Sequence, residues 1–144
     1  MLKTYLEYND FANRPFIEAL VNADAEIERE VLLMSHILNA HHIWNSRVKG
    51  VEPKYKVWQV QNVNELMSIH NENQKTTKEI LDSEDMNREI TYNNSQGNGY
   101  TNTVEDMMMQ ALNHGTYHRG QIAQLLRAKG IDPPGSDYIA FRRV

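Results

Sequence analysis

Four segments of the sequence repeat their apolar residues at helical spacing, and this pattern restricts the chain to a mostly helical fold. The segments lie at residues 2–20, 24–48, 64–81 and 104–129. Gly50 and Gly130 follow two of them, and glycine is the residue type that most easily adopts the left-handed turn beyond a helix. The pattern therefore predicts an all-α protein built from four helices.

Several local features refine this prediction. Pro15 falls inside the first helical segment and should kink or divide it, and Asp24 is a candidate N-cap for the second. Residues 89–93 and 100–103 flank a glycine-rich turn, which predicts a small β-hairpin before the last helix. Pro133 and Pro134 prevent the last helix from resuming, so we expect the tail, residues 136–144, to pack over the helices.

Length and charge limit the classes of protein and partner. A chain of 144 residues fits a single domain, residues 1–144, with a core of its own. The net charge of −4 and the absence of a Lys/Arg run argue against a nucleic-acid partner. No apolar run approaches the roughly 20 residues of a membrane span, and no signal-peptide core is present. We therefore expect a soluble, cytoplasmic protein without a membrane partner.

Three histidines are the candidate metal ligands. His114 and His118 are four residues apart, so they project from one face of the last helix. A helical wheel places His36 in the middle of the apolar face of the second helix. Three imidazoles would leave one position of a tetrahedral ion open, as catalytic sites do. The chain has no cysteine, so nitrogen and oxygen must hold any metal.

The other histidines are predicted to lie outside this site. On the same wheel His41 falls at the edge of the apolar face and His42 well outside it. His70 is expected to be a solvated residue that points away from the Leu66 and Ile69 face.

A site without metal is the alternative for the three inward histidines. Unsatisfied polar atoms in an interior cost about 1–3 kcal/mol each, and a bound cation would remove that cost. Imidazoles can instead bind one another or a buried water, which would give a metal-free helical protein. The spacing alone leaves both possibilities open.

Residues near the histidine pair offer few catalytic groups. No acidic residue forms a His-Glu-x-x-His motif, which argues against a zincin-type protease. Gln121 projects close to His114 and could line the site, Tyr117 lies near its edge, and Arg119 points sideways, for packing or a salt bridge. Residues 107–109 are methionines expected in the core and at an interface.

Three parts of the chain together resemble a known family. They are residues 6–13, residues 34–40 with Trp44 and Arg47, and residues 111–122 followed by Leu126, Gly130, Pro133 and Asp137. The most specific part is the run His-x-x-x-His-Arg-Gly-Gln, and the resemblance covers nearly the whole chain. The family is the DinB-like family of metal-binding four-helix bundles, which is related to the YfiT and mycothiol-dependent maleylpyruvate isomerase groups.

The resemblance implies a four-helix bundle with one long crossover, frequent homodimers, and a divalent metal, with Zn or Ni expected, on His36, His114 and His118. Related enzymes are thiol-dependent transferases and isomerases, so it implies a metal-dependent enzyme that activates a low-molecular-weight thiol and acts on a small-molecule substrate. Hydrolysis by activated water is the alternative reaction. A noncatalytic metal-binding or stress-response interaction module is the alternative function.

Overall fold

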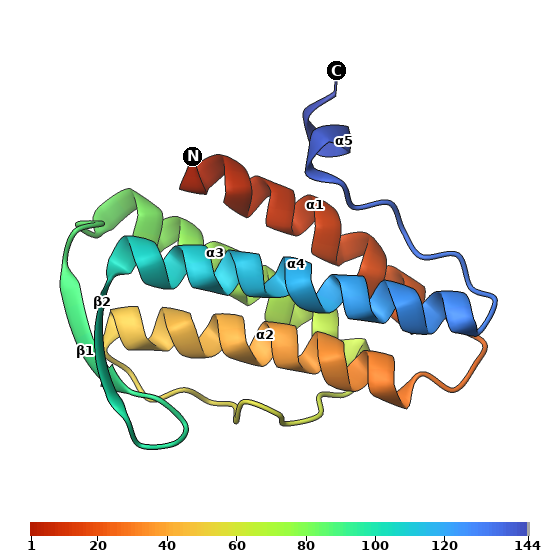
Figure 1. Ribbon diagram of the computed structural model, residues 1–144, viewed down its shortest axis with the longest axis horizontal. Helices are drawn as coiled ribbons and strands as arrows, with labels where there is room; N and C mark the ends of the chain where they lie inside the picture. Colours follow the sequence, from red (N-terminus) through yellow and green to blue (C-terminus); the bar gives the residue numbers. More distant parts are fainter. Residues whose placement is uncertain (144) are drawn as a thin grey trace.

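The computed structural model describes residues 1–143 and is mostly helical, with one small antiparallel hairpin (Figure 1). Both features agree with the sequence prediction. The elements in chain order are α1 (Leu2–Val21), α2 (Glu28–Lys49), the short 3-10 helix η1 (Val63–Glu65), α3 (Leu66–Ser83), β1 (Glu89–Asn93), β2 (Gly99–Thr103), α4 (Val104–Ala128) and α5 (Tyr138–Arg142).

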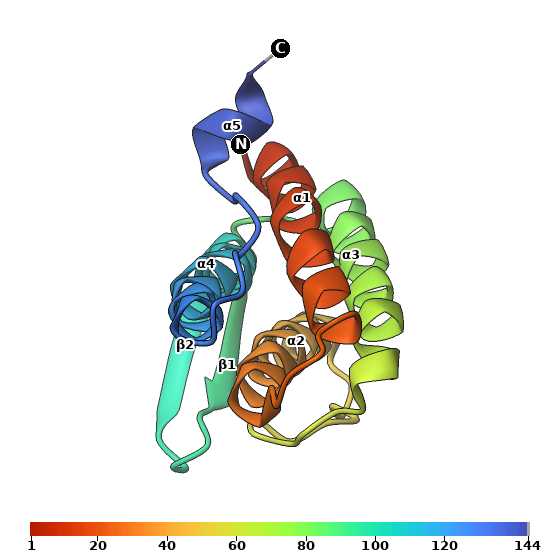
Figure 2. The ribbon, with the colours of Figure 1, turned by 90° about the vertical axis from the view of Figure 1, so that its right-hand side faces the viewer.

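The four long helices lie side by side around a common interior (Figure 2). Helix α4 packs against α1 and α2, and α3 packs against the same two helices from the other side. Helices α2 and α3 run in the same direction, because residues 50–62 return along α2 before α3 begins (Figure 1). The hairpin then connects α3 to α4, which runs in the opposite direction. None of the helices within residues 1–143 is both long and apolar enough to cross a membrane.

Most helix ends lie where local sequence chemistry places them. Gly50 and Gly130 follow α2 and α4 in the left-handed region, with φ of 69° and 75°. Thr103 caps α4, because its Oγ1 accepts a hydrogen bond from the Asp106 amide at 3.1 Å. Pro15 lies inside α1 without dividing it.

The predicted start of the second helix at Asp24 is wrong. Helix α2 begins at Glu28, its N-cap position is Ile27, and no side chain caps it. The chain needs the intervening residues to reverse direction between α1 and α2, which run antiparallel (Figure 1). A capping residue type therefore does not mark a helix start where the connection has to turn first.

The interior consists of two apolar clusters with polar residues between them. One cluster contains the second half of α1 and the first half of α2, with Phe16, Leu20 and Leu38 among its members. The other contains the start of α1 and the start of α4, with Leu6 and Leu112. Buried polar residues occupy the intervening turns: Asn9, Asn13, His36, Asn39, His41, Asn45, His70, Asn73, Thr77, His118 and Arg119. The candidate site thus lies in a polar middle layer.

The chain after α4 packs back onto α1. The Tyr8 hydroxyl donates a hydrogen bond to the Ser136 carbonyl oxygen at 2.5 Å, and the rings of Tyr138 and Phe141 pack edge-on against the Tyr8 ring. This confirms the predicted packing of the tail for the described residues; Val144, the last residue of the predicted tail, lies outside them.

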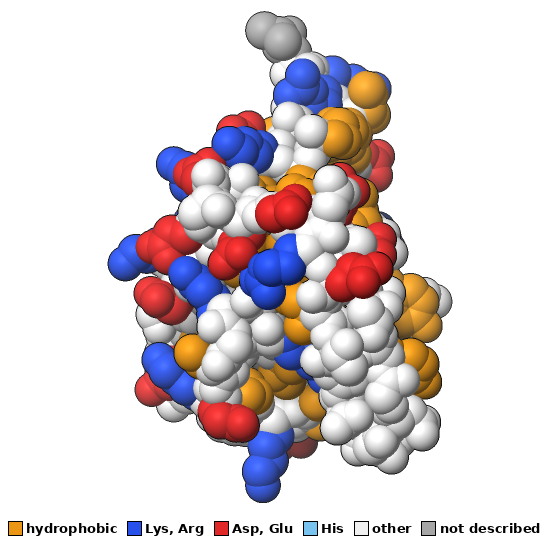
Figure 3. Space-filling view, turned by 90° about the vertical axis from the view of Figure 1, so that its left-hand side faces the viewer, with side chains coloured by type: hydrophobic (Ala, Val, Ile, Leu, Met, Phe, Trp, Pro, Cys, Tyr) orange, Lys and Arg blue, Asp and Glu red, His pale blue; other side chains and the backbone are white. Residues whose placement is uncertain are grey.

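Figure 3 views the molecule from the left-hand side of Figure 1. Acidic and basic side chains alternate over this face, so neither sign of charge dominates it.

Candidate metal centre

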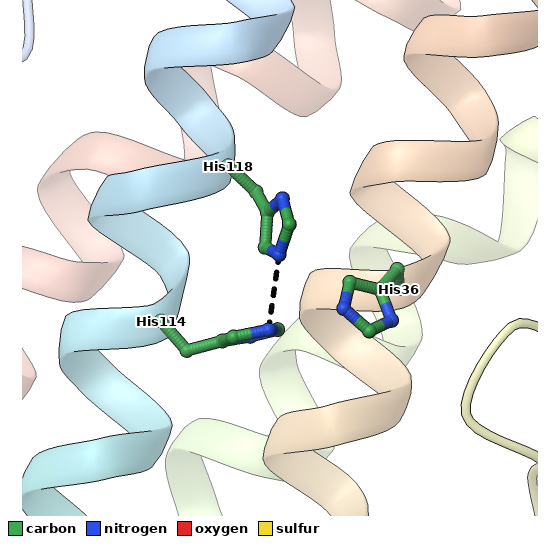
Figure 4. Close-up of side chains that lie close together, drawn as sticks. All are labelled: His36, His114 and His118. Carbon is green, nitrogen blue, oxygen red and sulfur yellow. Dashed lines mark hydrogen bonds between the residues drawn. The ribbon is translucent and has the colours of Figure 1, made fainter.

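Three imidazoles converge in the polar middle layer, one from α2 and two from α4 (Figure 4). They belong to His36, His114 and His118. Each ring contributes one nitrogen to a group of three nitrogens that all lie within 4.8 Å of one another. The ring centroids are 4.4 to 4.7 Å apart. The predicted convergence of the three histidines is therefore confirmed, and such a group of nitrogens could hold a metal ion.

Two of the imidazoles are oriented by hydrogen bonds at Nδ1. The Nδ1 of His36 lies 3.0 Å from the Val57 carbonyl oxygen, and that of His118 lies 2.7 Å from Gln121 Oε1. Because both partners are acceptors, each Nδ1 carries the proton and donates it. The Nε2 atoms of His36 and His118 are therefore left with free lone pairs, which is the tautomer of a metal-binding histidine.

The imidazole of His114 is incompletely satisfied by its neighbours. Its Nε2 lies 3.0 Å from His118 Nε2, a distance that requires a proton or a cation between two lone pairs. Its Nδ1 is buried and has no hydrogen-bond partner within the described chain. An orphaned imidazole nitrogen beside an all-nitrogen donor set fits a borderline divalent ion, for which imidazole is a common ligand.

Burial keeps two of the three imidazoles, those of His114 and His36, in their neutral form. It lowers the pKa of His114 to about 4, and the adjacent His118 and His36 act in the same direction. Burial also lowers the pKa of His36, although the hydrogen bond to Val57 opposes that change. Both imidazoles are therefore uncharged at neutral pH, the state that metal binding requires.

A short segment, residues 57–61, holds His36 from outside; we call it the strap. The Trp58 ring stacks on the His36 ring with 3.7 Å between centroids and an interplanar angle of 2°. Asn39 Nδ2 donates to the Gln59 carbonyl oxygen at 2.7 Å. Gln61 donates through its side chain to Asn39 Oδ1 at 2.9 Å and through its backbone to Ser35 Oγ at 3.0 Å. The strap is thus tied to one side of α2.

Sequence reasoning did not identify the strap as part of the site. The sequence does contain one indication of it, the apolar pair Val57 and Trp58 in the connection between two helices. A loop that only runs through solvent does not need apolar residues, so such a pair indicates packing against the protein. The rings of Trp58 and Tyr117 both reach the site. Tyr117 is 66% exposed and its ring lies 4.9 Å from that of His118.

The structure specifies the contacts of two neighbours of the pair. Gln121 lines the site as predicted, and its Oε1 accepts from His118 Nδ1. Arg119 makes no salt bridge within residues 1–143; it is buried and donates to Asn13 Oδ1 at 2.6 Å. Met107 and Met108 are core residues as predicted, whereas Met109 is partly exposed.

The prediction that His70 is solvated is wrong. His70 is fully buried, with Nε2 2.7 Å from Asp10 Oδ1 and Nδ1 3.4 Å from Asn13 Nδ2. On a helix of about 100° per residue it lies only about 40° from Leu66, so it does face inward.

His41 is also buried and bonds to Thr77 at 2.7 Å. Neither residue, nor the half-buried His42, belongs to the three-histidine group.

The fold and the site together define a class of mostly helical proteins that carry a three-histidine group between two helices. The profile of the DinB family matches residues 3–144, and the chain belongs to this family. One relative is Protein DinB of Bacillus subtilis (strain 168), which is 25% identical over 157 aligned positions; the alignment covers 92% of this chain and 88% of that protein.

Proposed function

We propose that this protein is a metal-dependent enzyme in which His36, His114 and His118 hold one divalent ion, Zn or Ni, inside a four-helix bundle with one long crossover. The observation that carries the proposal is the convergence of the three imidazoles within 4.8 Å. The hydrogen bonds from Nδ1 to Val57 and Gln121 add to it, because they direct Nε2 of His36 and His118 toward the shared centre.

The chemistry we propose is activation of a small thiol for transfer to a small-molecule acceptor. A divalent ion supplies Lewis acidity, which favours the thiolate form of a thiol or lowers the pKa of water. The chain has no cysteine, so the sulfur nucleophile comes from a low-molecular-weight thiol. The roles of the protein residues are to position the imidazoles, to keep those of His36 and His114 neutral, and to exclude water from His36 through the Trp58 ring.

Hydrolysis is the less favoured reaction, because the group that could hold the metal contains no carboxylate. A water nucleophile at a site of this type is commonly assisted by a neighbouring general base. A thiol that the ion would hold as thiolate, with its proton released to bulk water, would need no such base. A noncatalytic metal-binding module would share the site and differ only in having no turnover.

Elemental analysis of the untagged protein tests the metal site. We expect about one divalent ion per chain and its loss in His36→Ala, His114→Ala and His118→Ala. His42→Gln is the matched control, because His42 lies outside the cluster. Retention of metal by His118→Ala, or no uptake of added Zn or Ni by the native chain, would contradict the proposal.

An activity assay separates the proposed reactions. The metal-loaded protein is incubated with a small thiol and an electrophilic aromatic acceptor, and separately with ester substrates. We expect thiol consumption that depends on metal and is lost in His118→Ala. Ester hydrolysis without thiol transfer would favour the hydrolase, and metal-dependent stabilisation without turnover would favour the noncatalytic module.

The quaternary structure we propose is a homodimer, following the family. Light scattering coupled to size-exclusion chromatography of the untagged chain measures the mass directly. We expect twice the 16.8 kDa of one chain. A monomeric mass at the concentrations used for activity would contradict the dimer and leave the metal proposal unaffected.

A further inference from the structure

A cleft lies between α1, α4 and the chain after α4, on a different side of α4 from the three histidines. Its volume is about 860 Å³, which is in the range of small-molecule sites, about 300–1,000 Å³. His118 contacts α2, whereas the next residue, Arg119, turns toward α1 and lines this cleft. The cleft takes no part in the proposed metal chemistry.

The Arg119 guanidinium is the unusual group in the cleft. The side chain is 2% exposed, and its Nη1 donates to Asn13 Oδ1 at 2.6 Å. Its Nη2 donates to Thr116 Oγ1 at 3.1 Å, and the guanidinium carbon lies 5.6 Å from the centre of the Tyr8 ring. Amide, hydroxyl and ring partners are all neutral, so they stabilise the cation without cancelling its charge.

No carboxylate within residues 1–143 pairs with Arg119, and its Nε is buried without a hydrogen-bond partner there. Buried charges in proteins are normally paired, because an unpaired one loses its hydration without compensation. Arginine keeps its charge in such settings. The site therefore contains a cation that no carboxylate pairs with and whose Nε has no hydrogen-bond partner.

The chain also makes room for this cation. A Cβ atom at Gly115 would lie 2.9 Å from Arg119 Nη1, which is closer than side chains normally pack. The lack of a side chain at position 115 thus allows the guanidinium to lie between α1 and α4.

The walls of the cleft suit an anion with an apolar, flat body. Tyr5, Tyr8 and Tyr138 supply aromatic surface, and Arg127 adds a second cation. Asp137 is the one carboxylate among the residues that line it. Aromatic walls with a single deep cation match an organic carboxylate better than a bare inorganic ion.

We propose that this cleft binds a small aromatic or otherwise flat organic carboxylate, and that Arg119 pairs with the carboxylate group. The donor available for this pairing is Arg119 Nε, which has no hydrogen-bond partner within residues 1–143. Binding here needs no metal, so it stands or falls separately from the proposed function.

Calorimetric titration with benzoate tests this site, with benzamide as the neutral analogue of the same shape. We expect saturable binding of benzoate at about one per chain, and binding of benzamide at least tenfold weaker. Arg119→Met should abolish the preference for benzoate. Arg142→Met is the matched control, because Arg142 is exposed and does not line the cleft.

A second variant keeps the test decisive if Arg119→Met fails to fold. Gly120 lines the cleft, and a Cβ built there meets nothing within 4 Å. Gly120→Phe should therefore fill the cleft, keep the circular dichroism spectrum and lose benzoate binding. The proposal is overturned by no benzoate binding to the native chain, by equal affinity for benzamide, or by unchanged binding in Gly120→Phe. A native dimer that excludes benzoate and dissociates in Gly120→Phe would show instead that a second copy covers the cleft.

Discussion

The side chain of His118 illustrates how one residue can be fixed from both ring nitrogens. Gln121, one turn further along α4, accepts from Nδ1, and the opposite nitrogen faces His114. Outer hydrogen bonds of this kind set the tautomer and orientation of a metal-binding imidazole. Gln121 is therefore expected to influence a metal that it does not touch.

Replacement of Gln121 by leucine tests this role. Gln121→Leu removes the acceptor for Nδ1–H of His118, and loss of such a partner typically weakens metal affinity by about 10–100-fold. Competition against a chromophoric chelator measures the affinity for Zn. Gln124→Leu, an exposed position on the same helix, should leave it unchanged. Equal affinities for the two variants would contradict the positioning role.

Sequence alone predicted that the three histidines face one interior site, but it misplaced His70. Spacing of four residues and a position among apolar neighbours suffice for His36, His114 and His118, because both depend only on helix geometry. The environment of His70 depends on Asp10 and Asn13 of α1, which are polar and distant in sequence. Apolar periodicity gives no information about a buried face whose partners are polar.

Among the elements of the fold, the strap is the segment that holds a site residue from outside the helices, through the contacts of Val57 and Trp58 with His36. It has no regular secondary structure, and its position depends on hydrogen bonds to Ser35 and Asn39 of α2. Gly50 and Gly130 could be predicted as helix ends because left-handed turns are a local matter. The position of the strap could not be predicted in this way, because contacts with Ser35 and Asn39 of α2 determine where it lies along that helix.

Asn39→Ala should release the strap. The side chain of Asn39 is fully buried and bonds Gln59 and Gln61, so its removal leaves the buried Gln61 amide unpaired and frees the Gln59 carbonyl oxygen of the strap. We expect a loss of about 1–3 kcal/mol in the free energy of unfolding, measured by urea denaturation. Asn87→Ala, at an exposed position, is the control and should change stability by less than about 0.5 kcal/mol. A similar small change in both variants would show that the strap is not anchored through Asn39.

For the whole molecule, the polar middle layer makes stability depend on pH. Burial lowers the pKa of His41 to about 3, and the neighbouring His70 and His42 act in the same direction. Burial also lowers the pKa of His70, although the hydrogen bond to Asp10 opposes it. These residues stay neutral in the folded protein while the unfolded chain takes up protons below a pH of about 6.5. Stability is therefore full above that pH and falls as the pH decreases toward the folded pKa values.

The free energy of unfolding of the metal-free protein should consequently fall between pH 7 and pH 5. His41 alone contributes about 2 kcal/mol to that fall, since each proton taken up only by the unfolded state costs about 1.4 kcal/mol per pH unit. His41→Gln should reduce the pH slope by about one proton, measured by urea denaturation at several pH values. His42→Gln should reduce it less, because His42 is only partly buried. Parallel curves for His41→Gln and the native chain would contradict the assignment.

The stacking of Trp58 on His36 also gives the protein an internal optical reporter. Tryptophan emission is quenched when a copper or nickel ion comes within a few bond lengths of the indole, and Trp58 is in van der Waals contact with one of the proposed ligands. Trp44, the second tryptophan, packs against Tyr92 of the hairpin and Arg47, so it supplies a steady background. Occupancy of the centre can thus be followed by fluorescence in real time, without a label.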